Sequence, residues 1–474
     1  METSNSVASA RKEKDLLGDA WVPSDAYYGI QTQRACDNFD LSGVTLQHFP
    51  QLVNALSMVK LACAKANQKL NLIDDHKVTA IQAAVHTILQ GQHHDQFVVD
   101  MIQGGAGTST NMNANEVIAN IGLESMGYEK GEYKHLHPNN DVNMSQSTND
   151  AYPSAVRLAI LLKHSDLIRS LTGLRDAFAG KGMEFANIIK MGRTQLQDAV
   201  PMTLGQEFQS FATTLGEDID RLAGLSDLLK EINLGGTAIG TGINTDPEYA
   251  KFAVNFLSEI SGFEFKRATD LVEASSDMGA FILFSSMLKR LAVKLSKISN
   301  DLRMLSMGPR CGLNEINLPP QQPGSSIMPG KINPVIPEAV NQVAYQVIGN
   351  DLAVTMASEA GQLQLNAMEP LITYNILESM RMLTQAMDML KNRCVRGITA
   401  NVERCQELVD MSIGIITAVV PYLGYEDSTR IAKSALASGR GVLELIREEG
   451  LMTEEALQEV LKPSNMIQPQ KRRG

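Results

Sequence analysis

The sequence predicts an all-α protein built around a central bundle of long helices. Aromatic residues make up only 5% of the 474 residues, with one Trp, and there are 23 Met. This composition is typical of helices packed through Leu, Ile, Ala and Met rather than of β-sandwich cores. In the middle of the chain, several segments carry apolar residues at alternating spacings of three and four, which is the pattern of helices lying side by side in a bundle.

These segments follow one another between residues 167 and 390. In chain order, their apolar positions are Leu167, Leu171, Leu174 and Phe178; Leu204, Phe208, Phe211, Leu215, Ile219, Leu222, Leu225 and Leu229; Phe281, Phe284, Leu288, Leu291, Leu295, Ile298, Leu302 and Leu305; Ile336, Val340, Val343 and Val347; and Ile372, Ile376, Met380, Leu383, Met387 and Leu390. Other apolar residues, such as Leu283 and Val293, lie off this stripe. One neighbouring helix would not cover them, so we expect a surface that meets other subunits, with a large monomeric bundle as the alternative.

Polar, Gly-rich junctions separate the helical segments. They span residues 104–113, 139–150, 192–198, 235–244 and 319–333. Binding residues concentrate on such loops when rigid elements hold them. A chain of this length is too long for one small core. We expect an N-terminal domain (1–146), a central long-helix domain (147–400) and a small C-terminal helical domain (401–474).

Charge and cysteine usage exclude several classes of protein. The formal net charge of −11 argues against binding to nucleic acid or to an acidic membrane surface. The cysteines are odd in number and never form a CxxC pair, so neither a disulfide framework nor a metal site is predicted. Residues 1–14 lack the apolar core of a signal peptide, residues 470–474 are interpreted as a solvated tail, and the apolar run at 413–422 is too short to span a bilayer. We expect a cytoplasmic protein.

The segment 324–333, GSSIMPGKIN, gathers hydroxyls, glycines, a lysine and an amide where no helix can continue. It is not a phosphate-binding P-loop, because five residues separate its glycines and Ile332 follows the lysine. A flexible loop that carries two serines and Lys331 can close over a small anion and bring a proton acceptor with it. An ordinary surface loop is the alternative.

Three other junctions carry groups suited to a carboxylate. The stretch 104–109 offers small residues and hydroxyls before an expected helix. The run 145–150, SQSTND, precedes a helix that we expect to begin near Pro153, where one cap would need only one such residue. The stretch 192–198 adds a cation, a hydroxyl and an amide. All eight histidines lie at or before His164, so hydroxyl, amide and lysine groups dominate. These groups suit a dicarboxylate and a doubly charged carboxylate intermediate.

Several motifs together resemble the fumarase/aspartase superfamily. They are QGGAGTSTNMNANE, NMSQSTNDAYP, MGRTQLQDAVPMTLGQE, GPRCGLNEINLP and GSSIMPGKIN, in the order of the family over nearly the whole chain. The aspartate ammonia-lyase branch fits best, through the stretches 105–108, 270–274, 361–366 and 368–370; a class II fumarase typically has Lys where Glu369 stands. The resemblance implies the fumarase/aspartase fold, with the long bundle at the core of a homotetramer whose sites combine loops from three chains.

The resemblance also implies a reaction and roles. The reaction is reversible anti elimination of ammonia from L-aspartate to give fumarate through an aci-carboxylate. Ser325 is implied as the base; Thr108, Ser147, Thr148 and Ser326 as donors to the β-carboxylate; Lys331, Asn333 and Thr194 as ligands of the α-carboxylate; and Asn149 and Gln195 as contacts of the amine. No cofactor is required, although a divalent cation such as Mg²⁺ could activate at a peripheral site.

Two departures keep alternatives open. Many family members have His where this chain has Gln195, so a proton donor at that position is absent. This favours a lyase whose leaving group departs already protonated. The stretch His137-Pro138-Asn139 looks more like the peripheral anion site of fumarases. The second departure keeps open a class II fumarase, which hydrates fumarate to L-malate; a separate alternative is a catalytically silent structural paralogue.

Overall fold

The computed structural model describes residues 10–467, and helices make up most of that part of the chain. The prediction of an all-α protein is confirmed, because the strands there form only short two-stranded ribbons. The helices outside the bundle are α1 (Ile30–Asn38), α2 (Pro50–Lys69), α3 (Asp75–Leu89), α4 (Thr108–Ser125), α7 (Tyr249–Ser261), α11 (Val402–Met411), α12 (Ile416–Ser438), α13 (Val442–Glu448), α14 (Glu454–Val460) and α15 (Pro463–Met466). The expectations for residues 1–9 and 470–474 lie outside the described residues.

The ribbons pair in four places within the described residues. The pairs are β1 (Ala10–Asp15) with β2 (Gly18–Pro23), β3 (Ile189–Thr194) with β4 (Gln197–Thr203), β5 (Glu231–Ile232) with β6 (Lys266–Arg267), and β7 (Ile316–Asn317) with β8 (Thr399–Ala400). The β5–β6 pair is parallel and the other three are antiparallel.

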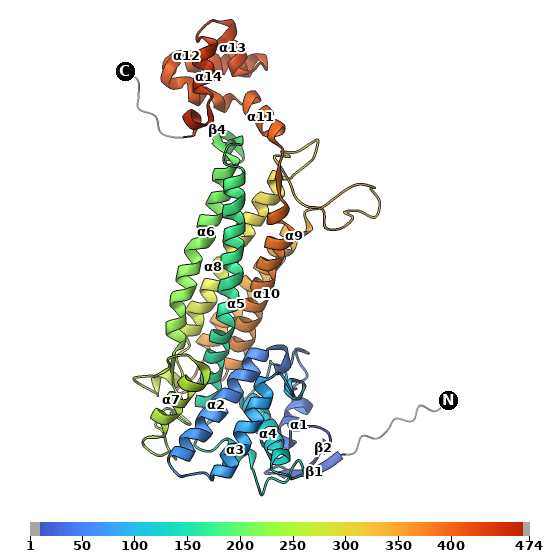
Figure 1. Cartoon of the computed structure of the whole chain (residues 1–474), viewed down its shortest axis with the longest axis vertical. Coiled ribbons are helices and arrows are strands. Elements are labelled where there is room, and N and C mark those ends of the chain that lie inside the picture. Colours follow the sequence, from blue (N-terminus) through green and yellow to red (C-terminus); the bar gives the residue numbers. More distant parts are fainter. Residues whose placement is uncertain (1–9, 468–474) are drawn as a thin grey trace, which may run out of the picture. The chain divides into compact units, whose positions relative to one another are not determined.

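The five predicted bundle helices are all present. They are α5 (Thr148–Glu184), α6 (Leu204–Leu225), α8 (Gly279–Leu305), α9 (Val335–Glu359) and α10 (Glu369–Arg393) (Figure 1). Each contributes residues to both of the compact units into which the chain divides. Within the described residues, unit 1 comprises 10–167, 221–290 and 346–382, and unit 2 comprises 168–220, 291–345 and 383–467. The expected domain boundaries at 146 and 400 stay a prediction.

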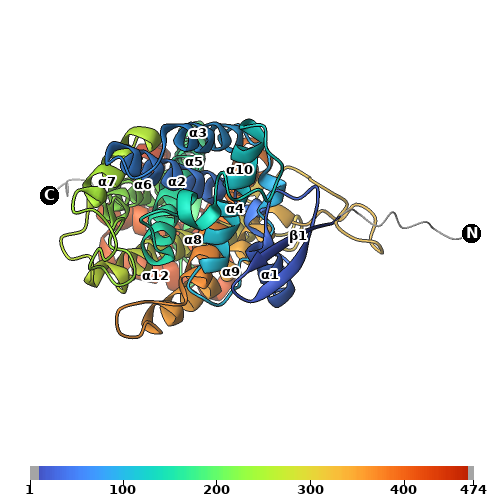
Figure 2. The same ribbon diagram turned by 90° about the horizontal axis from the view of Figure 1, so that it is seen from below.

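In unit 1, α2 packs against α3, α4 and α7 (Figure 2). Its part of the bundle is joined by polar contacts across otherwise apolar helix interfaces. The His164 ring Nε2 of α5 lies 2.9 Å from the Leu222 carbonyl of α6, and the Ser285 hydroxyl of α8 donates to Asp351 of α9 at 2.8 Å. Satisfied buried polar contacts of this kind favour one register of the helices over others.

In unit 2, the bundle is packed by aromatic side chains. The ring of Phe178 on α5 lies 6.1 Å from that of Phe208 and 5.6 Å from that of Phe211, both on α6. A separate hydrophobic core joins β3 to the C-terminal helices, with Met191, Ile446 and other residues buried in it. This core fixes the base of the β3–β4 hairpin, whose turn carries two of the predicted site residues.

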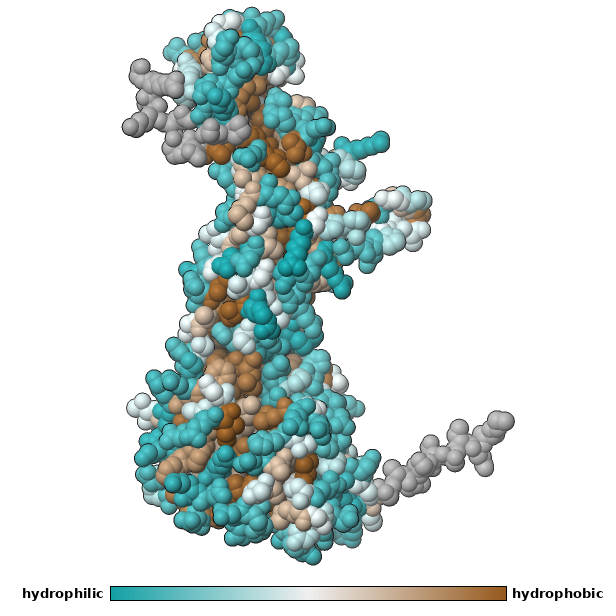
Figure 3. Space-filling model, viewed as in Figure 1, coloured by the Kyte–Doolittle hydropathy of each residue, from teal (hydrophilic) through white to brown (hydrophobic). Residues whose placement is uncertain are grey.

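Apolar residues also reach the surface of the long helices (Figure 3). On α8, the side chains of Leu283 and Val293 are 46% and 51% exposed in the single chain. Within residues 10–467, no single helix is long and apolar enough to cross a membrane, whereas the bent pair formed by Val402–Met411 and Ile413–Ser438 meets the length and composition criteria.

Candidate active site

The predicted site residues are divided between the two units. Unit 1 contains Thr108, Ser147, Thr148 and Asn149, and unit 2 contains Thr194, Gln195, Ser325, Ser326, Lys331 and Asn333. In unit 1 they lie at the starts of α4 and α5. In unit 2 they lie on the β3–β4 hairpin and on the loop before α9.

The buried Lys60 of α2 brings the unit 1 segments together. Its Nζ donates to Oδ1 of Asn111 at 2.6 Å, Oδ1 of Asn143 at 2.9 Å and Oε1 of Gln146 at 2.8 Å. All three acceptors are neutral amides, and burial lowers the pKa of Lys60 to about 8. Lys60 therefore joins the first turn of α4, which begins at Thr108, to the segment directly before Ser147. The sequence analysis missed it, although a lysine on the buried face of an apolar helix is a signal worth following.

The start of α4 is also fixed by close packing. Gly107 has φ +87°, and a Cβ at this position would lie 2.7 Å from the ring of Tyr152. Tyr152 is fully buried, and its hydroxyl donates to Thr373 at 3.2 Å. The glycine is thus required both by its backbone conformation and by the ring beneath it. This contact holds Thr108 above the second turn of α5.

The N-terminus of α5 lies earlier than expected. The helix begins at Thr148, so the prediction of a start near Pro153 is wrong. Ser147 and Asp150 form a reciprocal cap: the Ser147 hydroxyl accepts from the Asn149 N–H at 3.2 Å, and Asp150 accepts from the Ser147 N–H at 2.9 Å. Because the Ser147 oxygen accepts inside the turn, its O–H can donate to an external carboxylate.

The helix passes through Pro153 because another residue replaces the missing donor. A proline has no N–H, so the carbonyl four residues earlier, that of Asn149, loses its helical partner. The side-chain amide of Asn233 donates to this carbonyl at 2.9 Å. The satisfied carbonyl allows α5 to start five residues before the proline.

The turn of the β3–β4 hairpin presents Gln195. The register pairs Thr194 with Gln197, and the two residues between them, Gln195 and Leu196, have φ values of +52° and +63°. This is the backbone of a type I′ turn, where Asn and Gly are usual. Residues other than glycine in this region are strained, and such strain persists mainly where function requires it. Thr194 and Gln195 are both exposed.

The cation of the same hairpin is already paired within unit 2. Arg193 donates to Oε1 of Glu315 at 2.8 Å, and Lys190 lies 2.9 Å from Oε2 of the same carboxylate. Glu315 is fully buried, so the two cations neutralise it and fix the hairpin. Arg193 is therefore committed to the fold, and Lys331 is the cation of the predicted site segments that has no ion-pair partner among the described residues.

Hydrogen bonds join the two ends of the loop 324–333 at a point that we call its neck. The Gly324 N–H donates to the Lys331 carbonyl at 2.8 Å, and Nδ2 of Asn333 donates to the Gly324 carbonyl at 2.6 Å. The Asn333 amide has two N–H groups, so one is left for a ligand. Among the described residues, no hydrogen bond joins this loop to the β3–β4 hairpin.

Ser325 receives two backbone donors at the start of this loop. Its Oγ accepts from the Ile327 N–H at 3.2 Å and from the Met328 N–H at 3.0 Å. Hydrogen bonds to the charged form of a group favour that form. These amides therefore stabilise an alkoxide at Ser325 in preference to the neutral hydroxyl.

The remaining expectations concern metals and the peripheral anion site. Within residues 10–467, no group of three or more His, Cys, Asp or Glu side chains is arranged to hold a metal ion. The ring of His137 accepts from the N–H groups of Asn139 and Asn140 at 3.0 and 3.2 Å, so its Nδ1 caps the short helical turn Pro138–Val142. Burial lowers the pKa of His137.

The geometry can now be compared with known proteins. Residues 18–349 match the family model described as Lyase, and residues 415–468 match the model described as Fumarase C C-terminus. The chain belongs to the fumarase/aspartase superfamily of lyases. Superfamily members named aspartate ammonia-lyase are similar over nearly their whole length: the Pseudomonas aeruginosa protein is 69% identical over 98% of both chains, and the Escherichia coli K12 protein is 52% identical over 97% of this chain and 96% of its own.

Solved structures of the superfamily are similar as well. The fumarate lyase:delta crystallin from Brucella melitensis bound to cobalt has a TM-score of 0.95 and 60% identity, over 97% of this chain and 100% of that one. The class II fumarase from Schistosoma mansoni has a TM-score of 0.92 and 35% identity, over 98% of this chain and 100% of that one. The fumarase/aspartase-like fold is thus confirmed.

Proposed function

We propose that the protein is an aspartate ammonia-lyase, which reversibly eliminates ammonia from L-aspartate to give fumarate. The observation that carries this proposal is the full-length similarity, at 52% to 69% identity, to proteins of that name from several bacteria. The fold alone does not decide, because a class II fumarase shares it at 35% identity.

The chemistry requires strong stabilisation of one carboxylate. The Cβ proton of aspartate is barely acidic, and it can be removed only if the adjacent β-carboxylate takes up the charge as an aci-carboxylate. Donors must bind that group more tightly in the transition state than in the substrate. Thr108, Ser147, Thr148 and Ser326 are hydroxyls suited to this role, and the capped oxygen of Ser147 leaves its O–H available. Ser325 removes the proton.

The other end of the substrate needs a different set of groups. Lys331, Asn333 and Thr194 hold the α-carboxylate, and Lys331 supplies the positive charge because Arg193 is paired with Glu315. Asn149 and Gln195 contact the amine. Neither is a good acid, which suits a leaving group that departs without receiving a proton from the enzyme.

The decisive experiment follows fumarate by its ultraviolet absorbance. The purified protein is incubated with L-aspartate, and separately with fumarate plus ammonia and with fumarate alone. We expect fumarate from aspartate, and aspartate only when ammonia is present. Formation of L-malate from fumarate alone would identify a fumarase instead, and no turnover in any arm would identify a silent paralogue.

The neck of the loop offers a test of the site in the same assay. A Cβ at residue 324 would lie 2.4 Å from the Lys331 carbonyl, so Gly324→Ala must open the neck. We expect kcat to fall by about a hundredfold, as for a misplacement of about 1 Å, with little change in Tm. Gly180→Ala is the matched control, since nothing lies within 4 Å of its added methyl group. Wild-type kcat in Gly324→Ala would contradict a role for the loop.

The proposal also covers the oligomeric state, the location in the cell and the use of cofactors. A homotetramer would cover apolar residues that are exposed in the single chain, such as Leu352 and Met356 of α9, which are 61% and 65% exposed. The reaction needs no resident cofactor, although Mg²⁺ could activate at a peripheral site. A cytoplasmic location fits the unpaired cysteines. Light scattering tests the assembly, and dialysis against a chelator tests the cation.

A further inference from the structure

Asn149 is held by three hydrogen bonds that leave its Oδ1 and one N–H of its Nδ2 without a partner among the described residues. Its backbone N–H donates to Ser147, its carbonyl accepts from Asn233, and its side-chain Nδ2 donates to the Ala238 carbonyl at 2.7 Å. No residue between 10 and 467 donates to its Oδ1. The bond to Ala238 fixes which way the amide is turned, because a carbonyl accepts from Nδ2 and repels Oδ1. Asn149 therefore presents an acceptor.

The segment that carries Ala238 is fixed by Asp150. Oδ2 of this fully buried carboxylate accepts from the Gly235 N–H at 2.9 Å and the Thr237 N–H at 3.1 Å, while Oδ1 caps Ser147. One side chain thus sets both the helix start and the loop opposite it. The sequence analysis noted residues 235–244 as a polar junction but assigned them no role.

The backbone of this loop is strained at Thr237. This residue has φ +53°, which is a rare conformation for a β-branched side chain. The strain is offset by the bond to Asp150 and by the Thr237 hydroxyl, which donates to the Ile243 carbonyl at 3.2 Å. Gly240 is needed nearby, because a Cβ there would lie 2.3 Å from the Leu271 carbonyl. Such strain clusters at functional sites.

We infer that Asp150 and the 233–238 loop are a positioning device that turns the Asn149 amide so that its oxygen accepts from the amine of the substrate. This inference rests on the proposed function and extends it. An ammonium or ammonia N–H can donate to Oδ1, whereas a carboxylate is repelled by it. The device therefore places the amine of the substrate at Asn149.

The test uses the addition reaction, in which ammonia and fumarate can be varied separately. Asp150→Asn keeps the side-chain volume but places an N–H group against backbone N–H donors. We expect the KM for ammonia to rise by about 3-fold to 10-fold, the scale of one hydrogen bond between neutral groups. The KM for fumarate and the inhibition constant of succinate, a diacid without an amine, should stay near their wild-type values.

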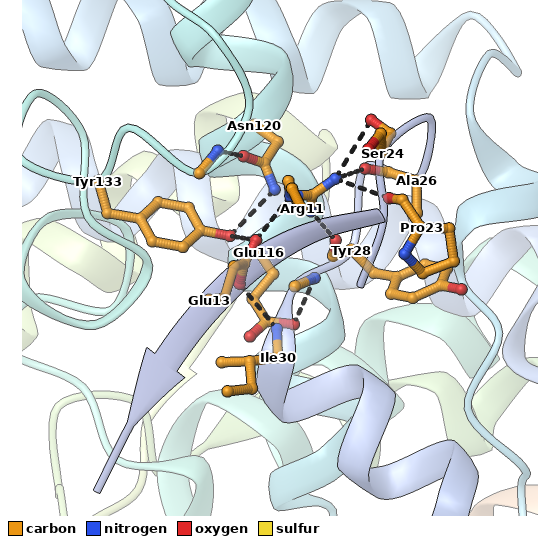
Figure 4. Close-up of polar contacts among 12 residues, drawn as sticks. Arg11, Glu13, Pro23, Ser24, Ala26, Tyr28, Ile30, Glu116, Asn120 and Tyr133 are labelled. Atoms are coloured by element: carbon orange, nitrogen blue, oxygen red, sulfur yellow. Dashed lines mark hydrogen bonds and ion pairs between the residues drawn. The ribbon is translucent and has the colours of Figure 1, made fainter. Parts of the chain in front are cut away.

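Glu116→Gln is the matched control. Glu116 is also a buried carboxylate of unit 1, and it accepts from three backbone N–H groups, those of Gly29, Gln31 and Thr32, at 2.8 to 3.1 Å. Figure 4 shows it beside Glu13, and its backbone donors lie at the start of α1, not in the 233–238 loop. We expect a comparable loss of Tm in both variants. Only Glu116→Gln should keep the wild-type ratio of the KM for ammonia to the inhibition constant of succinate.

Two outcomes would overturn the inference: an unchanged ammonia KM in Asp150→Asn, or an equal rise in the ammonia and succinate constants. Asn233→Ala provides a second variant if Asp150→Asn does not fold, because it leaves the carboxylate and its donors in place; a smaller rise confined to ammonia is expected. If the wild type does not turn over L-aspartate, the proposed function fails. Calorimetry then decides the inference separately, since L-aspartate binding must weaken in Asp150→Asn while succinate binding does not.

Discussion

Replacing Ser325 by alanine is expected to lower kcat by about two orders of magnitude or more, on the usual scale for loss of a general base. The fold and the oligomer should be unaffected, because the hydrogen bonds of the Ser325 side chain within residues 10–467 come from the Ile327 and Met328 amides of its own loop. The measurement is initial fumarate formation at saturating L-aspartate.

The size of this effect follows from how far the pKa of the Ser325 hydroxyl must fall for it to act as a base. Each unit by which its pKa falls takes about 1.4 kcal/mol of selective stabilisation of the alkoxide. Two backbone N–H donors supply part of it. We expect Lys331 and the exclusion of water on loop closure to supply the rest.

The control for Ser325→Ala removes a hydroxyl elsewhere in unit 2. Ser210 is exposed on α6 and donates to the Glu207 carbonyl, so Ser210→Ala should keep wild-type kcat. Circular dichroism and light scattering check that both variants fold and assemble. Near-wild-type turnover in Ser325→Ala would remove this residue from the role of base.

Replacing Lys331 by alanine should weaken substrate binding as well as turnover. Lys331 is exposed in the single chain, and Arg193 cannot replace its charge because Arg193 is paired with Glu315. Loss of a hydrogen bond to a charged group corresponds to about 1.5 to 3 kcal/mol, or about 10-fold to 100-fold in kcat/KM. Loss of support for the Ser325 alkoxide lowers kcat further.

The control for Lys331→Ala tests whether the effect comes from the charge at this position or from the net charge of the protein. Lys297→Ala also takes the formal net charge from −11 to −12, but it removes a surface lysine of α8 that is paired with Asp301. We expect wild-type constants in Lys297→Ala and partial recovery of KM in Lys331→Arg. An unchanged KM in Lys331→Ala would contradict the assignment.

The sequence was sufficient for features that repeat along the chain. The five bundle helices were predicted because their apolar spacing persists over several turns, and residues such as Leu288 and Leu291 are indeed buried. The start of α5 was not predicted, because it depends on Asn233, 84 residues from the carbonyl that it satisfies. The local sequence pattern shows the proline but not the distant residue that compensates for it.

The site residues show the same contrast between local sequence patterns and contacts with distant residues. The clusters of hydroxyls and amides were visible as runs of unusual composition, and the roles that the family resemblance implies for them stay predictions. Lys60 was missed and Asp150 was noted only as part of the run 145–150, because the importance of both comes from burial and from partners distant in sequence. The pairing of Arg193 with Glu315 was missed for the same reason, since 122 residues separate them.

That pairing has a consequence for how firmly the enzyme retains its product. Fumarate carries two negative charges, and Lys331 is the one cation among the residues proposed to contact the substrate; the others are neutral hydroxyls and amides. Dipoles bind a resting dianion weakly but respond strongly as charge builds on one oxygen pair. We therefore expect fumarate to be released readily rather than held tightly, which suits a reversible reaction.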